Sequence, residues 1–229
     1  ASIIIVPKKL QSFSDSFPPN KTIILANDPI LLFSRIARDL FVKMPEPGIH
    51  NSAYIHPDAI IGQNVHIGAF CYIGKCSIGE NTIILNNVTI EDEVAIGKNV
   101  YIKNGARIGQ TGFGFVKNEY GKYEKFPQIG KVIIEDNVEI GANTCIDRGA
   151  LSDTIIGSNT KVNSLCHIAH NVEIGNSVII TAQVNVSGST IIGNNVWISP
   201  NSTLIGHQKI GDGVLIGAGS VVLGDIHSN

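Results

Sequence analysis

Apolar, mostly β-branched residues recur every six positions along most of this chain. One run of such residues extends from Ile78 to Ile108, and a second run extends from Ile156 to Val222. A glycine often follows the apolar residue, as in Ile96-Gly97. A period of six fits neither an α-helix, which repeats every 3.6 residues, nor a strand with one buried face, which repeats every two. The pattern is typical of an all-β parallel β-helix, in which three six-residue repeats form one coil.

The first part of the chain does not follow this period. Residues 3–6 and 22–25 have the composition of short strands, and Asn27-Asp28-Pro29 is a helix-start signal. A helix is therefore predicted from Ile30 to Phe41. Its buried stripe is predicted from three-and-four spacing to consist of Leu32, Phe33, Ile36, Ala37 and Leu40.

The domain organisation follows from these two patterns. We expect a partial α/β segment over residues 1–44, a proline- and glycine-rich linker over 45–48, and a β-helix over 49–229. The number of repeats corresponds to about eight coils, each rising ~4.8 Å. The segment over 1–44 is too short to bury a core by itself.

Two interruptions of the repeat are candidates for functional loops. The first covers roughly residues 109–129 and contains Gly112-Phe113-Gly114-Phe115. The second is a bulge of four extra residues within 147–153. Long loops on a regular scaffold often contain functional residues.

The repeat also predicts which distant residues share one face of the coils. Anchors that are 18 residues apart should stack. Once the four extra residues of the bulge are discounted, one column is predicted to contain Ile146, Ile168, Val186 and Leu204. His170 and Gly188 follow two of these anchors and should lie one rung apart. His207 follows a third anchor, and the 147–153 bulge follows the first. The sequence thus predicts that these four features meet in one place.

Three interpretations of this cluster remain open at this point. In the first, neutral His170 deprotonates a nucleophile while a backbone N–H near Gly188 stabilises the oxyanion of an acyl transfer. In the second, His170 and His207 bind zinc at a subunit interface, although no third histidine ligand follows from the spacing. In the third, His167 and His170 are ordinary polar residues on a corner.

Composition excludes some classes of function. The formal net charge is −2, and the 17 lysines and arginines are scattered, which argues against a nucleic-acid-binding surface. The four cysteines form no CxxC pair, and buried packing positions suit them best. Because no signal peptide or long apolar run is present, we expect a cytoplasmic protein without a transmembrane segment. We also expect no metal site.

Several motifs resemble those of the UDP-3-O-(3-hydroxyacyl)glucosamine N-acyltransferases of lipid A biosynthesis. They are the Gly112–Phe115 motif, Pro127–Val132, Ile146–Leu151 and Ile168–Val172, and the similarity extends over roughly residues 20–222. The resemblance implies a left-handed parallel β-helix that forms a homotrimer, with active sites between subunits. It implies no tightly bound cofactor, and an acyl-carrier-protein or coenzyme A thioester as donor.

The resemblance also implies roles for individual residues. His170 matches the catalytic base, Gly188 matches the glycine whose N–H forms the oxyanion hole, and His207 matches a second active-site histidine. Further residues expected to contact substrate are Asp28 and Phe33 in the uridine-binding segment, Phe113, Asp147 and Arg148 in the loop motifs, and Asn163.

Three departures from the family's pattern affect these expectations. Asn163 occupies the position where the family usually has an aspartate seven residues before the catalytic histidine, and an amide cannot stabilise an imidazolium by charge. Part of the uridine-binding domain and the C-terminal helices that engage the carrier protein have no counterpart. The alternative to transfer of a 3-hydroxyacyl group is therefore an acetyl-CoA-dependent N-acetyltransferase of a nucleotide-linked amino sugar.

Overall fold

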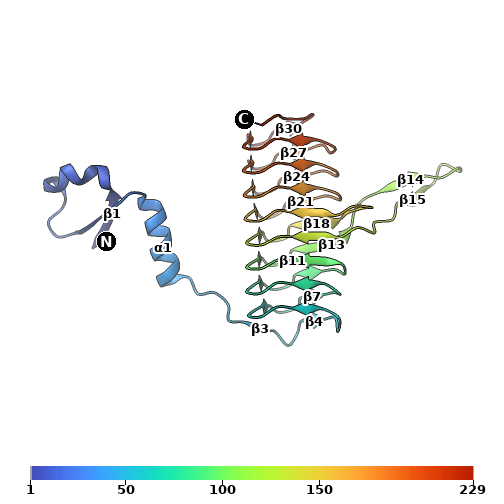
Figure 1. Cartoon of the computed structure of the whole chain (residues 1–229), viewed down its shortest axis with the longest axis horizontal. Helices are drawn as coiled ribbons and strands as arrows, with labels where there is room; N and C mark the ends of the chain where they lie inside the picture. Colours follow the sequence, from blue (N-terminus) through green and yellow to red (C-terminus); the bar gives the residue numbers. More distant parts are fainter. Residues whose placement is uncertain (1, 229) are drawn as a thin grey trace. The chain divides into compact units, whose positions relative to one another are not determined.

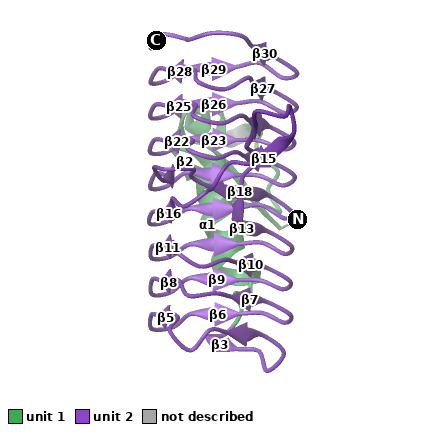
Figure 2. Ribbon diagram, turned by 90° about the vertical axis from the view of Figure 1, so that its right-hand side faces the viewer, with its two compact units in different colours: residues 1–45 green, residues 46–229 purple. Residues whose placement is uncertain are grey.

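The structure is a computed structural model that describes residues 2–228, apart from the side chains of residues 14 and 15. It consists of two compact units, residues 1–45 and residues 46–229, shown in different colours in Figure 2. The boundary falls at the start of the predicted 45–48 linker.

The first unit is a small α/β segment. Its elements are β1 (Ile3–Pro7), the 3₁₀ helix η1 (Lys8–Ser16), β2 (Thr22–Ala26) and α1 (Pro29–Phe41). The strands β1 and β2 pair in parallel. The two strands and the helix match their predicted ranges to within one residue, whereas η1 was not predicted.

The predicted buried stripe of α1 is wrong in part. Leu32, Ile36 and Ala37 are half-buried, but Phe33 is 63% exposed and Leu40 is 70% exposed. No residue of α1 is fully buried. The physical reason is size, because two short strands offer too little apolar surface to cover one whole face of a 13-residue helix.

The second unit is a parallel β-helix whose coils stack as successive rungs (Figure 1). Each coil has three short strands, and equivalent strands of successive coils form the three faces of the β-helix. The predicted all-β fold class, a left-handed parallel β-helix preceded by a small α/β segment, is confirmed.

Face 1 contains nine strands. They are β4 (Tyr54–Ile55), β7 (Tyr72–Ile73), β10 (Thr89–Ile90), β13 (Arg107–Thr111), β18 (Cys145–Arg148), β21 (His167–Ile168), β24 (Asn185–Val186), β27 (Thr203–Leu204) and β30 (Val221–Val222).

Face 2 contains eight strands. They are β5 (Ile60–Ile61), β8 (Ser77–Ile78), β11 (Val94–Ile96), β16 (Val132–Ile134), β19 (Thr154–Ile156), β22 (Glu173–Ile174), β25 (Ile191–Ile192) and β28 (Lys209–Ile210).

Face 3 contains nine strands, so the β-helix is slightly longer than the predicted eight coils. They are β3 (Gly48–Ile49), β6 (His66–Ile67), β9 (Ile83–Ile84), β12 (Tyr101–Ile102), β17 (Glu139–Ile140), β20 (Lys161–Val162), β23 (Ile179–Ile180), β26 (Trp197–Ile198) and β29 (Leu215–Ile216).

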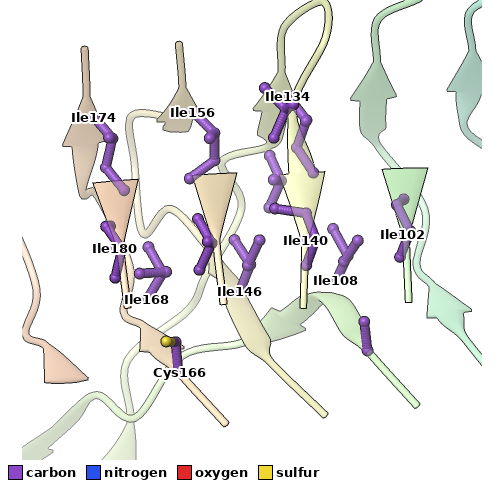
Figure 3. Packing of buried hydrophobic residues seen from close by; sticks show 14 of the residues in the cluster. Ile102, Ile108, Ile134, Ile140, Ile146, Ile156, Cys166, Ile168, Ile174 and Ile180 are labelled. Atoms are coloured by element: carbon purple, nitrogen blue, oxygen red, sulfur yellow. The ribbon is translucent and has the colours of Figure 1, made fainter. Parts of the chain in front are cut away.

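The six-residue anchors form the core. Ile102, Ile140 and Ile180 are among the residues with no exposed surface, and Figure 3 shows these side chains stacked between the faces. Cys71, Cys76 and Cys166 are buried in the same cluster, which confirms their predicted packing role. Corners between strands repeatedly place a residue at positive φ, often an asparagine such as Asn195 (φ 56°). Asparagine tolerates this left-handed conformation better than most residues.

The first interruption of the repeat is not an irregular loop. It forms an antiparallel hairpin of β14 (Phe115–Lys117) and β15 (Tyr123–Lys125), which projects from the β-helix in Figure 1. The second interruption follows β18 and remains a bulge.

Candidate active site

The predicted column of stacked anchors is confirmed. On face 1, Ile146 pairs with Ile168, Ile168 with Val186, and Val186 with Leu204. The corners that follow these strands are therefore stacked as well. The Ser189 N–H donates to the His170 carbonyl over 3.0 Å, and the His207 N–H donates to the Gly188 carbonyl over 3.0 Å.

The imidazole of His170 lies directly against Gly188. A Cβ placed on Gly188 would lie 2.7 Å from His170 Cε1 and 2.9 Å from Nε2, so any larger residue here would displace the His170 ring. Within residues 2–228 no acceptor pairs with the Gly188 N–H. An imidazole nitrogen and an unpaired backbone donor thus share one place, which is the arrangement that acyl transfer needs.

Asn171 holds the His170 ring. The Asn171 Nδ2 donates to the Ser152 carbonyl (3.0 Å) and to its hydroxyl (2.7 Å), whereas the Asn171 Oδ1 accepts from the Ala150 N–H (3.0 Å). A carbonyl can only accept and an N–H can only donate, so these contacts fix the orientation of the amide.

The fixed amide determines the tautomer of His170. The Asn171 Oδ1 lies 3.0 Å from His170 Nδ1, and this oxygen can only accept. The proton of the neutral imidazole therefore belongs on Nδ1, and Nε2 retains its lone pair. The bulge positions Asn171, and the contact of Asn171 with Nδ1 leaves the lone pair of the neutral imidazole on Nε2 of His170.

A second histidine makes a separate pair on the same face. His167 Nε2 lies 3.1 Å from the Oδ2 of Asp147, and His167 Nδ1 lies 3.3 Å from the Oδ1 of Asn185. The hydrogen bond to the buried Asp147 carboxylate raises the pKa of His167 above its ordinary value, while partial burial opposes the shift. This pair therefore favours the protonated form of His167.

A cavity of about 420 Å³ opens beside His170. It is bounded by the base of the hairpin, the bulge and the corner of the following coil. Its lining residues are Gly114, Phe115, Val116, Phe126, Gln128, Ala150, Leu151, Ser152, His170, Asn171 and Ser189.

Gly112 of the hairpin motif closes one side of this region. A Cβ on Gly112 would lie 3.1 Å from both Cβ and Cδ2 of His170. The ring of His170 is therefore flanked by two glycines that lie far apart in the sequence.

The other predicted site residues have varied surroundings. Arg148 donates to the backbone carbonyls of Gly109 (2.9 Å) and Asp92 (2.5 Å), so its guanidinium braces neighbouring coils. Phe113 is 85% exposed and makes an edge contact with Phe115, with 5.0 Å between ring centroids. His207 is exposed and has a positive φ of 55°.

Asn163 makes no hydrogen bond with His170 within the described residues. Its Oδ1 accepts from the N–H of Ser164 over 2.7 Å, and its side chain is exposed. Asn171, which directly follows the histidine, makes the side-chain contact with the imidazole.

Asp28 and Phe33 belong to the first unit. The carboxylate of Asp28 caps α1 by accepting from the Leu31 N–H over 2.9 Å, which is a structural role of a kind common at helix starts. The ring of Phe33 is largely exposed on the same helix.

Sequence reasoning missed two residues of this site. Asn171 was seen as part of a motif, but its role depends on the conformation of the bulge, which no periodicity predicts. Gln128 lines the cavity because the hairpin returns the chain to His170, and its position in the Pro127–Val132 motif was the available signal.

Comparisons with known proteins agree with this geometry. Residues 153–188 and 189–224 match the bacterial transferase hexapeptide (six repeats), residues 131–164 match the hexapeptide repeat of succinyl-transferase, and residues 44–111 match the GMPPB C-terminal domain. A UDP-3-O-acylglucosamine N-acyltransferase of Pseudomonas syringae pv. tomato is 41% identical over 180 residues, which are 69% of this chain and 51% of that protein. The protein of the same name from Pseudomonas putida is 43% identical over 181 residues, which are 70% of this chain and 50% of that protein. Over this matched part the chain is similar to the UDP-3-O-acylglucosamine N-acyltransferases.

This similarity confirms the resemblance drawn from the motifs. The chain spans about half the length of the curated relatives it matches. Among solved structures, a UDP-N-acetylglucosamine acyltransferase of Francisella novicida has a TM-score of 0.69 at 28% identity, covering 76% of this chain and 62% of its own. A UDP-N-acetylglucosamine acyltransferase from Campylobacter jejuni has a TM-score of 0.69 at 26% identity. The match covers 78% of this chain and 68% of that chain.

Two kinds of structural feature are absent from residues 2–228. No helix among them combines the length and apolar character needed to cross a membrane. In the same range, no three histidine, cysteine, aspartate or glutamate side chains gather in a way that could hold a metal ion.

Proposed function

We propose that this protein transfers an acyl group from a thioester to the 2-amine of a UDP-3-O-acylglucosamine. The observation that carries the proposal is the pairing of the His170 imidazole with the unpaired N–H of Gly188. The names of the curated relatives support the identity of the acceptor. A 3-hydroxyacyl group on acyl carrier protein is the donor that we expect for the lipid A pathway.

The reaction begins with His170 as a neutral base. The amine lone pair attacks the thioester carbonyl carbon, and His170 Nε2 removes one proton from the amine nitrogen. The carbonyl electron pair moves to oxygen, where the Gly188 N–H stabilises the negative charge. Collapse of the tetrahedral intermediate reforms the carbonyl and expels the thiolate, which takes the proton from the His170 imidazolium.

Other residues would bind the substrates. We propose that Asp28 and Phe33 contact the uridine, and that Phe113 contacts the acyl substrate through the exposed apolar tip of the hairpin. His207 would assist substrate binding one coil above Gly188. Asp147, Arg148 and Asn163 remain in the proposed substrate site, although Arg148 acts mainly through the coils that it braces.

We infer that the protein forms a homotrimer in the cytoplasm. Apolar side chains on the outer side of face 3 support self-association, since Trp197 is 47% exposed and Leu215 is 69% exposed. Such surface is more often buried between subunits than left in water. Sedimentation equilibrium should give three times the chain mass of 24.5 kDa, and a monomer at micromolar concentration would contradict the inference.

Steady-state kinetics on His170→Ala test the proposed function. We expect kcat/KM with a hydroxyacyl carrier-protein thioester to fall by about 10²–10⁴-fold, the usual effect of removing a general base. His50→Ala is the matched control, because His50 is an exposed histidine near the start of the β-helix. Unchanged turnover by His170→Ala would refute the assignment of the base.

The same assay separates the two candidate donors. If acetyl-CoA were used far better than the hydroxyacyl carrier protein by the same preparation, the protein would be an N-acetyltransferase of a nucleotide-linked amino sugar. Equal or better use of the carrier protein supports the lipid A reaction.

A further inference from the structure

One buried oxygen beside His170 has no hydrogen-bond partner. Gln128 is 8% exposed, and its Oε1 makes no hydrogen bond in the described structure. The Gln128 Nε2 donates to the Phe126 carbonyl at 3.5 Å. Because that carbonyl can only accept, the amide must direct its NH₂ group towards Phe126 and its oxygen away from it.

The unpaired oxygen lies on the Cδ2 side of the His170 ring. A single point, the position of a Cβ on Gly112, is 3.1 Å from the Gln128 Oε1 and 3.1 Å from His170 Cδ2. A Cβ on Gly114 would lie 3.1 Å from the Gln128 Nε2. The two glycines of the hairpin motif therefore leave the space that this amide occupies, and the amide lines the same cavity as His170.

An unpaired buried carbonyl is unfavourable unless a ligand completes it. Leaving such an acceptor unsatisfied costs free energy that a bound donor would recover. The nearest chemistry in the cavity is that of the attacking nucleophile. An amine has two N–H groups, and His170 can accept only one of their protons.

We infer that Gln128 accepts a hydrogen bond from the second N–H of the attacking amine, and that this contact selects an amine over a hydroxyl. The inference rests on the proposed function. During the reaction one N–H proton passes to His170 Nε2 and ends on the thiol product. The other N–H stays on nitrogen and is retained in the product amide, still directed at the Gln128 Oε1.

A hydroxyl nucleophile lacks this second hydrogen. Its one proton would go to His170, so the ester product would have no donor left for the Gln128 oxygen. That oxygen would remain buried and unpaired throughout the reaction. A site that pairs a substrate N–H discriminates strongly against an analogue without it.

The test compares two nucleophiles in Gln128→Met, which keeps the side-chain length and removes the strong acceptor. The nucleophiles are UDP-3-O-acylglucosamine and its analogue with a hydroxyl in place of the 2-amine. We expect kcat/KM for the amine to fall by about 10–100-fold. We expect kcat/KM for the hydroxyl analogue to stay within about threefold, so that the preference for the amine shrinks.

Two further variants make the result decisive. Gln128→Glu retains an oxygen acceptor and should restore part of the amine preference. Gln208→Met is the matched control, because Gln208 Oε1 is also buried and unpaired, but this residue donates to Val222 near the last coil and does not line the cavity. It should leave the amine preference unchanged.

Several outcomes would overturn the inference. One is an equal loss for both nucleophiles in Gln128→Met, which would indicate a purely structural role. Another is a change confined to KM for the thioester, which would place Gln128 at the donor. Melting temperatures of all variants show whether a loss of activity comes from misfolding. If Gln128→Met is misfolded, Gln128→Glu supplies the comparison. Absence of acyl transfer to UDP-3-O-acylglucosamine by the wild-type protein, from either thioester donor, would instead refute the proposed function itself.

Discussion

Replacement of Asn171 should separate the positioning of His170 from the stability of the bulge. Asn171→Gly removes four hydrogen bonds, two accepted by Oδ1 and two donated by Nδ2. At about 0.5–1.5 kcal/mol for each neutral bond, and with water replacing some of them, we expect a loss of about 2–4 kcal/mol in the free energy of unfolding. Asn171 has a φ of 61°, which glycine adopts without strain.

The same change should reduce catalysis more than stability alone explains. Without the Oδ1 acceptor, nothing holds the proton on His170 Nδ1, and the ring is free to rotate or to place the proton on Nε2. We expect kcat/KM to fall by about 10²–10⁴-fold, comparable to the loss of the base itself. The assay is thioester turnover at a temperature where chemical denaturation shows the variant to be fully folded.

Asn195→Gly is the matched control for this prediction. Asn195 occupies an equivalent corner with a φ of 56°, and its side chain forms no hydrogen bond with residues 2–228. Its replacement carries the same backbone entropy cost without the loss of the network. If Asn171→Gly kept the turnover of Asn195→Gly, the argument that Asn171 orients the base would be refuted.

Three further predictions concern neighbouring features. Gly188→Ala should lower kcat by about 10²–10³-fold with little change in melting temperature. The reason is that the new methyl group displaces the His170 ring from the backbone donor. A kcat equal to that of the wild type would contradict this prediction. In His167→Gln, the variant should lose stability relative to wild type mainly at acidic pH. The raised pKa of His167 makes the pair with Asp147 stabilising below the ordinary histidine pKa, and this contribution disappears as pH rises through the folded-state pKa. Denaturation curves from about pH 5.5 to pH 9 measure the difference, and a gap that grows towards alkaline pH would oppose the assignment. Ile168→Ala should cost about 2–5 kcal/mol by opening a cavity in a fully buried stack, as measured by urea denaturation, and a loss below 1 kcal/mol would contradict the packing.

The six-residue period predicted the parts of this molecule that depend on stacking. It placed Ile146, Ile168 and Val186 in one column, and from that column it brought His170 next to Gly188. These predictions succeed because each rung of a parallel β-helix repeats the geometry of the rung below, so sequence separation converts directly into distance.

The same period could not predict features that interrupt the coils. The hairpin and the bulge have no repeat to fix their conformation, so the contacts of Asn171 and Gln128 appear only in three dimensions. The prediction of a buried stripe on α1 was partly wrong for a different reason. Periodicity identifies which side chains share a helix face, but burial of Phe33 also requires a partner surface, and β1 and β2 do not supply enough of it.

The tautomer of His170 is the most direct test of the central claim. Nitrogen-15 NMR of histidine-labelled protein near pH 8, assigned by comparison with His170→Ala, distinguishes a protonated Nδ1 from a protonated Nε2. The structure predicts a proton on Nδ1 and a lone pair on the Nε2 that faces Gly188. A proton found on Nε2 would contradict the role of His170 as the base that receives the amine proton.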